Sequence, residues 1–202
     1  MRLILVRHGE SAANETRTHN SREEPLTARG HKQAQCVAER LRTEHIDRVI
    51  CSNLPRAVDT AAAILKYHAG VPVAYDDRIR EIDNGVFAGK PYGVRNIAAD
   101  AMGIHVSGFR PENGENMLDR SHRVKLFLNE LLDKPSNETV LIVAHGGSIA
   151  DSLHTLTDEA QEYAKWSVRN TSITIVEVGE SVRIHVLNDI GHVPKELQTH
   201  NT

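Results

Sequence analysis

Five residues of the sequence carry groups that could act together on a phosphate ester: Arg7, His8, Arg56, Glu81 and His145. Arginine guanidinium groups bind phosphate oxygens through paired N–H donors. A neutral imidazole can attack phosphorus and later leave, which allows covalent catalysis. A carboxylic acid can protonate the departing alkoxide and then act as a base on water. Brought together, these groups would suffice to hydrolyse a phosphomonoester without a metal.

Short apolar segments precede these residues and predict the strands that position them. Residues 3–6, 49–51, 71–75 and 140–144 are typical of short strands, and most of them of buried ones. One or two of the reactive residues follow each strand, directly or after a short loop. Because open parallel sheets bind ligands at the carboxyl ends of their strands, we expect the five residues to converge at one edge of a sheet.

Helical patterns alternate with these strands. Residues 26–41, 55–67 and 116–132 have helical spacing, and Thr27 is suited to cap the first helix. A hairpin is expected over residues 173–186. The alternation predicts an α/β fold with a mostly parallel central sheet of about six strands, one edge antiparallel, and helices on both faces. In the helix expected over residues 116–132, the apolar side chains should lie on or near one stripe of the surface. These side chains are Leu118, Val124, Phe127, Leu128 and Leu131.

Each reactive residue also has a simpler interpretation when it is taken alone. A histidine after a strand, such as His8 or His145, is more often a hydrogen-bonded structural residue than a catalyst. Arg56 alone would be a solvated residue in the first turn of a helix. Glu81 ends a charged stretch, residues 76–81, that would usually be exposed. Only their shared placement at strand ends favours a functional interpretation.

Six segments in order along the chain resemble the motifs of the histidine phosphatase superfamily, in its phosphoglycerate-mutase-like branch. The resemblance covers residues 3–192, and that family's fold with a lid insertion is therefore expected. The segments are RHGESAAN at 7–14, PLTARGHKQA at 25–34, SNLPRAVDTA at 52–61, REIDNG at 80–85, VAHGG at 143–147 and LNDIGH at 187–192.

The resemblance implies a role for each matching residue. His8 would be the nucleophile that becomes phosphohistidine, and Glu81 would protonate the leaving oxygen and then activate water. Arg7, Arg56 and His145 would hold the phosphoryl oxygens. No metal and no cofactor are implied. The further residues expected to bind phosphate or substrate are Asn14, Gly146, Asn20 and Ser11.

The sequence departs from the family pattern at two places. Asn20-Ser21 stands where the family often has Gln-Gly, so Asn20 would replace the amide. The segment Gly85-Val86-Phe87-Ala88-Gly89 keeps an aromatic residue but has Ala88 in place of a glutamate. We expect packing or specificity to differ there, and the core chemistry to be kept.

The leading interpretation is a metal-independent phosphatase of small phosphomonoesters, such as sugar phosphates or phosphoglycerates. A phosphoglycerate mutase or a fructose-2,6-bisphosphatase-like activity on the same fold is the nearest alternative. The stretch between Glu81 and His145 is short for a mutase, which favours hydrolysis. A serine esterase using Ser148 with His185 or His192, and a phosphate binder without catalysis, are more remote alternatives.

Composition narrows the class of protein. With 24 Lys+Arg and 27 Asp+Glu among 202 residues, the net charge of −3 argues against an electrostatic nucleic-acid binder. No apolar run approaches the roughly 20 residues that span a bilayer. We therefore expect a cytoplasmic protein whose partner is a small phosphorylated metabolite, with neither nucleic acid nor membrane as a partner. The sequence leaves open whether the chain forms a homodimer.

One domain is expected over residues 1–202, with residues 85–116 as a lid that sets specificity. The segment is rich in glycine and proline. Any of its cationic side chains could meet a second anionic group of the substrate, although each singly is expected to be a solvated surface charge. These side chains are Lys90, Arg95, His105 and Arg110.

Overall fold

The structure is a computed structural model that describes residues 1–157 and 166–199. Its centre is a six-stranded sheet in the order β3-β2-β4-β1-β5-β6. The first four strands in the chain pair in parallel, whereas β5 pairs antiparallel with both of its neighbours, β1 and β6. The predicted sheet with one antiparallel edge is therefore confirmed. The strands are β1 (Arg2–Arg7), β2 (Arg48–Cys51), β3 (Val73–Tyr75), β4 (Thr139–Ala144), β5 (Ile173–Val178) and β6 (Val182–Asp189).

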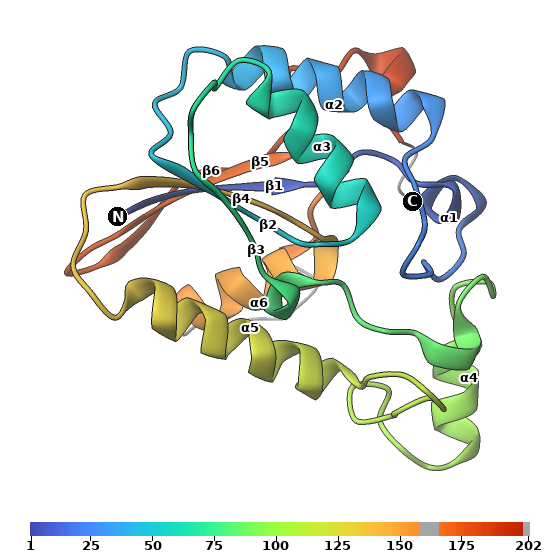
Figure 1. The fold of residues 1–202 in the computed structure, drawn as a ribbon. Coiled ribbons are helices and arrows are strands. Elements are labelled where there is room, and N and C mark those ends of the chain that lie inside the picture. The colour runs from blue at the N-terminus through green and yellow to red at the C-terminus, as the bar shows by residue number, and fades with distance from the viewer. Residues whose placement is uncertain (158–165, 200–202) are drawn as a thin grey trace.

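Helices pack on both faces of the sheet (Figure 1). On one face lie α2 (Ala28–Leu41) and α3 (Pro55–Leu65), and on the other lie α5 (Met117–Leu132) and α6 (Gly146–Thr157). Thr27 caps α2 by accepting a hydrogen bond from the Gly30 N–H, as the sequence predicts.

Two apolar cores result from the alternation of side chains along the central strands. On β1, Leu3 and Leu5 belong to the cluster with α5 and α6, whereas Ile4 and Val6 belong to the cluster with α2 and α3. All four are at most 1% exposed. The sheet is therefore held from both faces, which fixes the strand ends where the reactive residues lie.

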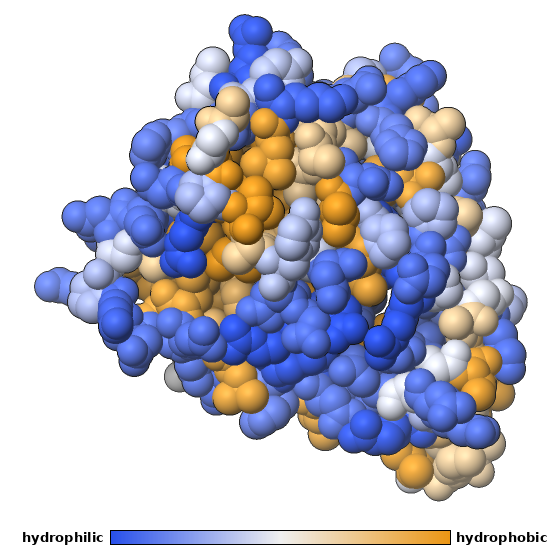
Figure 2. All heavy atoms as spheres, viewed as in Figure 1, coloured by the Kyte–Doolittle hydropathy of each residue, from blue (hydrophilic) through white to orange (hydrophobic). Residues whose placement is uncertain are grey.

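The edge strand β3 is less buried than the central strands. Its three residues are all exposed. Figure 2 shows that hydrophilic residues cover most of this face, while hydrophobic residues gather in a hollow of the surface. Val73 and Tyr75 of β3 are among the exposed large hydrophobic residues.

Three helices are additional to those expected from the sequence: α1 (Ala12–Thr16), α4 (Val94–Ala101) and α6. The two glycines that begin α6 have low helix propensity, so residue propensities alone do not predict a helix at this position. The stripe expected on α5 was partly wrong. Leu118 is 60% exposed, whereas Arg120 is only 5% exposed.

Residues 85–116 extend from the body of the protein and include α4 (Figure 1). Their role as a lid stays a prediction, as does the assignment of a single domain. No described helix has the length and apolar character that crossing a membrane requires.

Candidate active site

His8 directly follows β1, at the carboxyl end of the sheet, and is 2% exposed. Its Nδ1 lies 2.6 Å from the carbonyl oxygen of Gly9. Because a carbonyl oxygen can only accept, Nδ1 carries the hydrogen and Nε2 keeps its lone pair. The ring lines a cavity of about 500 Å³. The imidazole thus has the tautomer that a nucleophile needs.

Burial lowers the pKa of His8 well below its ordinary value, and the nearby charges of Arg56 and Arg7 lower it further. His145 contributes in the same direction. The ring of His8 is therefore neutral at pH 7. A protonated imidazole could not attack phosphorus, so this environment favours the nucleophilic form.

His145 follows β4 and is fully buried, with its ring centroid 5.0 Å from that of His8. Its Nε2 lies 2.8 Å from Ser52 Oγ. The Ser52 hydroxyl accepts a hydrogen bond from the Leu54 N–H, so its own hydrogen is available for His145 Nε2. Nδ1 then carries the proton of the neutral ring. This buried nitrogen has no hydrogen-bond partner in the described part of the chain, and His145 itself is not among the residues that line the cavity of His8.

Burial, followed by the charges of Arg56 and Arg7, also lowers the pKa of His145 well below its ordinary value. His145 is therefore a neutral N–H donor beside His8. Such a donor can bind a phosphoryl oxygen without placing a second positive charge next to the nucleophile.

Four of the predicted phosphate or substrate contacts line the same cavity as His8: Arg7, Asn14, Asn20 and Gly146. Arg7 Nη1 donates to the Val168 carbonyl at 2.6 Å, and its Nε is buried with no hydrogen-bond partner within the described ranges. Gly146 begins α6, whose first N–H groups have no partner within the helix. Helix N-termini bind anions through such groups. The arrangement can therefore hold a dianionic phosphoryl group next to His8 Nε2.

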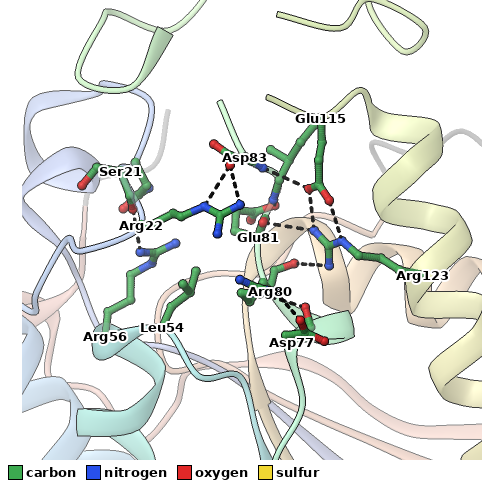
Figure 3. Close-up of a pocket in the computed structure, with 12 residues that line it drawn as sticks. Ser21, Arg22, Leu54, Arg56, Asp77, Arg80, Glu81, Asp83, Glu115 and Arg123 are labelled. Atoms are coloured by element: carbon green, nitrogen blue, oxygen red, sulfur yellow. Dashed lines mark hydrogen bonds and ion pairs between the residues drawn. The ribbon is translucent and has the colours of Figure 1, made fainter. Parts of the chain in front are cut away.

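Arg56 lies in a second cavity, of about 270 Å³, that adjoins the first (Figure 3). Asn20, Glu81 and Ile82 line both cavities and so stand between them. Arg56 is 1% exposed and donates from Nη1 to the Ser21 carbonyl at 3.1 Å. Burial lowers the pKa of Arg56 to about 10, so it remains a cation at neutral pH.

Glu81 lines the wall of the cavity that contains His8. Its Oε1 accepts from Arg120 Nη1 at 3.1 Å and from the Ile82 N–H at 2.9 Å, and its Oε2 accepts from the Gly147 N–H at 3.0 Å. Burial raises the pKa of this carboxyl. The positive charge of Arg120, the two N–H donors and Arg56 outweigh burial and bring the pKa to about 2. Glu81 is therefore a carboxylate in the free protein.

Asp83, the carboxylate two residues after Glu81, lies in the second cavity and does not line the first. Arg22 pairs with its Oδ2 at 2.6 Å, and Oδ1 accepts from the Gly85 N–H at 3.0 Å. Figure 3 shows Arg22 extended across the second cavity to Asp83. Glu81 is thus the carboxylate on the cavity of His8.

Ser11 and Asn20 have different positions. Asn20 lines the cavity with His8, whereas Ser11 does not. Ser11 caps α1, and its hydroxyl donates to Asn20 Oδ1 at 2.7 Å. Ser11 is therefore placed to orient Asn20, and the expected direct contact with substrate is not supported by the geometry.

The esterase alternative requires Ser148 beside a histidine, and the structure contradicts it. Ser148 is 1% exposed, and its hydroxyl donates to the Arg80 carbonyl at 2.6 Å. His185 pairs with Glu177 on the exposed hairpin, and His192 Nε2 contacts the Thr171 carbonyl. A serine in an α/β-hydrolase elbow would instead present its hydroxyl to a pocket.

Only one of the lid cations lines the cavity of His8, namely Arg95. It is 2% exposed and donates from Nη2 to the carbonyls of Phe109 and Glu115. The others have partners elsewhere. Lys90 lies over the Phe87 ring, His105 contacts Ser107, and Arg110 pairs with Asp119.

Arg120 and Asp151 are site residues that the sequence reasoning missed, together with Ser52. A signal for Arg120 was present, since it lies four residues before Val124 and eight before Leu128, on the buried face of α5. A charged residue in an apolar stripe indicates a buried partner. Asp151 on α6 supplies it at 2.7 Å.

Comparison with known proteins identifies the family of the chain. The family model described as histidine phosphatase superfamily (branch 1) matches residues 3–190. A probable phosphoglycerate mutase GpmB from Yersinia enterocolitica is 31% identical over 191 residues, which is 90% of this chain and 86% of that protein.

Two solved structures have similar folds and are each more than 25% identical to this chain. A putative alpha-ribazole-5′-P phosphatase from Escherichia coli has a TM-score of 0.82 and 27% identity, over 94% of this chain and 96% of that one. A mycobacterial glucosyl-3-phosphoglycerate phosphatase, solved with VO3, has a TM-score of 0.76 and 28% identity, over 93% and 98%. The chain therefore belongs to the histidine phosphatase superfamily (branch 1), as a phosphoglycerate-mutase-like member.

Proposed function

We propose that this protein is a phosphatase that hydrolyses small phosphomonoesters through a phosphohistidine at His8. The observation that carries the proposal is the hydrogen bond from His8 Nδ1 to the Gly9 carbonyl, which leaves Nε2 as a neutral nucleophile on a cavity. Arg7, Asn14 and the N-terminus of α6 line the same cavity and are suited to hold the phosphoryl oxygens.

In the first step, His8 Nε2 attacks phosphorus, and the bond from phosphorus to the ester oxygen breaks. The leaving oxygen takes a proton from Glu81, and the phosphoryl group stays on His8. In the second step, water attacks phosphorus while Glu81 accepts a proton from it. The P–N bond then breaks, which frees inorganic phosphate and restores neutral His8.

Glu81 must take up a proton before it can act as an acid, because its pKa is about 2 in the free protein. A bound phosphoryl dianion brings negative charge next to this carboxylate. A neighbouring like charge raises the pKa of a carboxyl group. Substrate binding therefore favours the protonated form that the first step needs.

A phosphoglycerate mutase is the second candidate, because the probable GpmB proteins are among the relatives. A mutase would return the phosphoryl group from His8 to a second hydroxyl before water reached it. The cavity beside His8 has a volume of about 500 Å³, which leaves room for water next to the phosphohistidine. Hydrolysis is the reaction this geometry favours.

The test is to incubate the protein with glycerol 2-phosphate, 2-phosphoglycerate and p-nitrophenyl phosphate, and to measure both free phosphate and isomerised phosphoglycerate. We expect free phosphate as the main product. His8→Ala should abolish it, whereas His185→Ala, a matched change on the exposed hairpin, should not. Isomerisation faster than phosphate release would favour the mutase, and full activity of His8→Ala would refute both.

A further inference from the structure

Asn170 lies shortly before β5 and donates two hydrogen bonds from its side-chain Nδ2. One goes to the carbonyl oxygen of His8 at 3.0 Å, and the other goes to Asn14 Oδ1 at 3.1 Å. Asn170 is 4% exposed and does not line the cavity of His8. It therefore contacts the backbone of the nucleophile and a predicted phosphate contact from outside the cavity.

Backbone groups determine the orientation of both amides. The His8 carbonyl can only accept, so it must face Nδ2 of Asn170. The Ser11 N–H can only donate, so the atom of Asn14 that lies 3.2 Å from it is Oδ1. Asn14 Oδ1 thus accepts from both Ser11 and Asn170. This leaves the amino group of Asn14 for the cavity that the residue lines.

The orientation of the Asn14 amide decides whether it can assist phosphoryl transfer. Its amino group would donate to a phosphoryl oxygen, whereas its carbonyl oxygen would repel one. The two ends of an amide have nearly the same size, so packing alone does not distinguish them. Reversing the amide would place its amino group against the donors of Ser11 and Asn170. These two donors therefore fix the orientation that suits phosphate.

A left-handed residue directly after Asn170 fixes its place in the fold. Thr171 has a φ angle of 53° and is fully buried. A β-branched residue rarely adopts this conformation, which persists only where the surrounding structure imposes it. The Thr171 N–H donates to the Arg7 carbonyl at 3.0 Å, and His192 Nε2 lies 3.1 Å from the Thr171 carbonyl oxygen. The strained residue is thus tied to the end of the strand that precedes His8.

The other end of the Asn170 amide argues against a purely structural role. Its Oδ1 is buried and has no hydrogen-bond partner within residues 1–157 and 166–199. A buried acceptor without a partner lowers the free energy of unfolding. Asn14 Oδ1 would keep its bond from Ser11 without Asn170. The His8 carbonyl would keep one from the Thr171 N–H at 3.3 Å. The fold would therefore accept an apolar side chain at this position.

We propose that Asn170 is a positioning residue that fixes the Asn14 amide with its amino group toward the transferring phosphoryl group. The inference rests on the proposed function, in which His8 receives that group and Asn14 binds one of its oxygens. Asn170 acts through Asn14 and does not itself touch the substrate. A donor fixed in advance stabilises the charge that shifts onto the phosphoryl oxygens in the transition state.

The test is a double-mutant cycle that combines Asn170→Leu with Asn14→Ala. Leucine has nearly the shape of asparagine without its polar atoms. The measured quantity is kcat/KM on glycerol 2-phosphate and on p-nitrophenyl phosphate. Asn170→Leu alone should lower it about 10-fold, the upper range for one hydrogen bond. Asn14→Ala alone should lower it about 10²–10³-fold, as the loss of an oxyanion donor does.

The two losses should not add. Once Asn14 is alanine, no amide remains to be oriented, so Asn170→Leu should then cost less than about 2-fold. Asn170→Ala, which cannot crowd its neighbours, should show the same coupling. It keeps the test valid if Asn170→Leu folds poorly.

Two further measurements separate positioning from a structural role. Asn170→Leu should keep the midpoint of thermal unfolding, because it leaves no buried polar group without a partner. Orthovanadate resembles the phosphoryl group in transfer, so its inhibition constant should rise about 10-fold, in step with the loss of kcat/KM. A structural defect would lower the midpoint and would reduce activity whether or not Asn14 is present.

Asn129→Leu is the matched control, because Asn129 is an exposed asparagine on α5. It should change neither kcat/KM nor the inhibition constant of orthovanadate.

The outcomes separate this inference from the proposed function. Absence of turnover by wild type on both esters would refute the phosphatase itself. With an active wild type, equal losses from Asn170→Leu in the presence and in the absence of Asn14 would refute only the role of Asn170. Wild-type kcat/KM in both Asn170 variants would refute that role as well.

Discussion

At the scale of single residues, the site keeps two histidines neutral beside two arginines. Burial and the positive charges of Arg7 and Arg56 both lower the pKa of His8 and of His145. Hydrogen bonds then favour one tautomer of each neutral ring. The Gly9 carbonyl favours the hydrogen on Nδ1 of His8, and a hydrogen bond from Ser52 to Nε2 favours the hydrogen on Nδ1 of His145. One ring presents a lone pair and the other presents an N–H donor, as nucleophilic attack on phosphorus requires.

Glu81→Gln should slow the hydrolysis of an alkyl phosphate far more than that of p-nitrophenyl phosphate. An alkoxide needs a proton to leave, whereas p-nitrophenolate is a weak base and hardly needs one. General acid catalysis is worth about 10²–10⁴-fold, so the contrast should be large. The measurement is the rate of the phosphorylation step on glycerol 2-phosphate and on p-nitrophenyl phosphate.

Asp83→Asn is the matched control for this change. Asp83 pairs with Arg22 in the second cavity and does not line the cavity of His8. We expect it to slow both substrates to a similar, small extent. If the selective loss occurred in Asp83→Asn and not in Glu81→Gln, the acid would have been assigned to the wrong carboxylate.

At the scale of elements, the carboxyl ends of β1 and β4 and the start of α6 build the site. His8 and His145 follow adjacent parallel strands, which places their rings 5.0 Å apart. The turn from β4 into α6 brings the Gly147 N–H to Glu81. Two glycines at this turn let the side chains of other elements approach the helix backbone.

Gly147→Ala tests this close approach. The new methyl group would overlap Arg120 Nη1 and Glu81 Oε1, so both side chains must move. We expect a loss of at least about 10²-fold in kcat/KM on glycerol 2-phosphate, because misplacing a catalytic group by about 1 Å has that effect.

The control is Gly179→Ala, in the turn between β5 and β6, where an added Cβ meets nothing within 4 Å. It should keep both activity and the midpoint of thermal unfolding. Wild-type activity in Gly147→Ala would show that Glu81 and Arg120 need not lie where the structure places them.

Much of this arrangement could be predicted from the sequence, because its signals are local. The apolar run of residues 140–144 and the cap at Thr27 each determine an element by themselves. The order of strands and helices then brings His8 and His145 to one edge of the sheet. Thus the fold and the position of the two histidines followed from short segments.

The parts that could not be predicted depend on pairing between distant segments. Arg120 and Asp151 are 31 residues apart in the sequence. They become buried ion-pair partners only because α5 and α6 pack side by side. In the second cavity, Arg22 reaches Asp83 from another loop, 61 residues away in the sequence. Periodicity indicated a helix at residues 116–132 and aligned Arg120 with Val124 and Leu128, but it could not identify Asp151 on α6 as the partner of Arg120.

At the scale of the whole molecule, neutral buried histidines make stability depend on pH. His8 and His145 have lowered pKa values in the native state, whereas histidine titrates near 6.5 in an unfolded chain. Below pH 6.5 these two histidines therefore bind protons in the unfolded state but stay neutral in the native state. Stability should be fully present above that pH and fall as the pH decreases.

The expected slope is about 1.4 kcal/mol per pH unit for each of these histidines below pH 6. Urea denaturation at a series of pH values between 7 and 5 measures it. His8→Asn should reduce the slope by about one such contribution, and His185→Asn, at an exposed position, should not. An unchanged slope in His8→Asn would show that His8 takes up a proton in the native protein.

The most direct test of the central claim is to trap the phosphorylated protein. Mixing Glu81→Gln with p-nitrophenyl phosphate should give a burst of p-nitrophenol and about one phosphoryl group per active site, since the same change slows hydrolysis of the intermediate. The group should be acid-labile and stable to base, and peptide mapping under alkaline conditions should locate it on His8. A burst without phosphohistidine, or a phosphoryl group on another residue, would contradict the account.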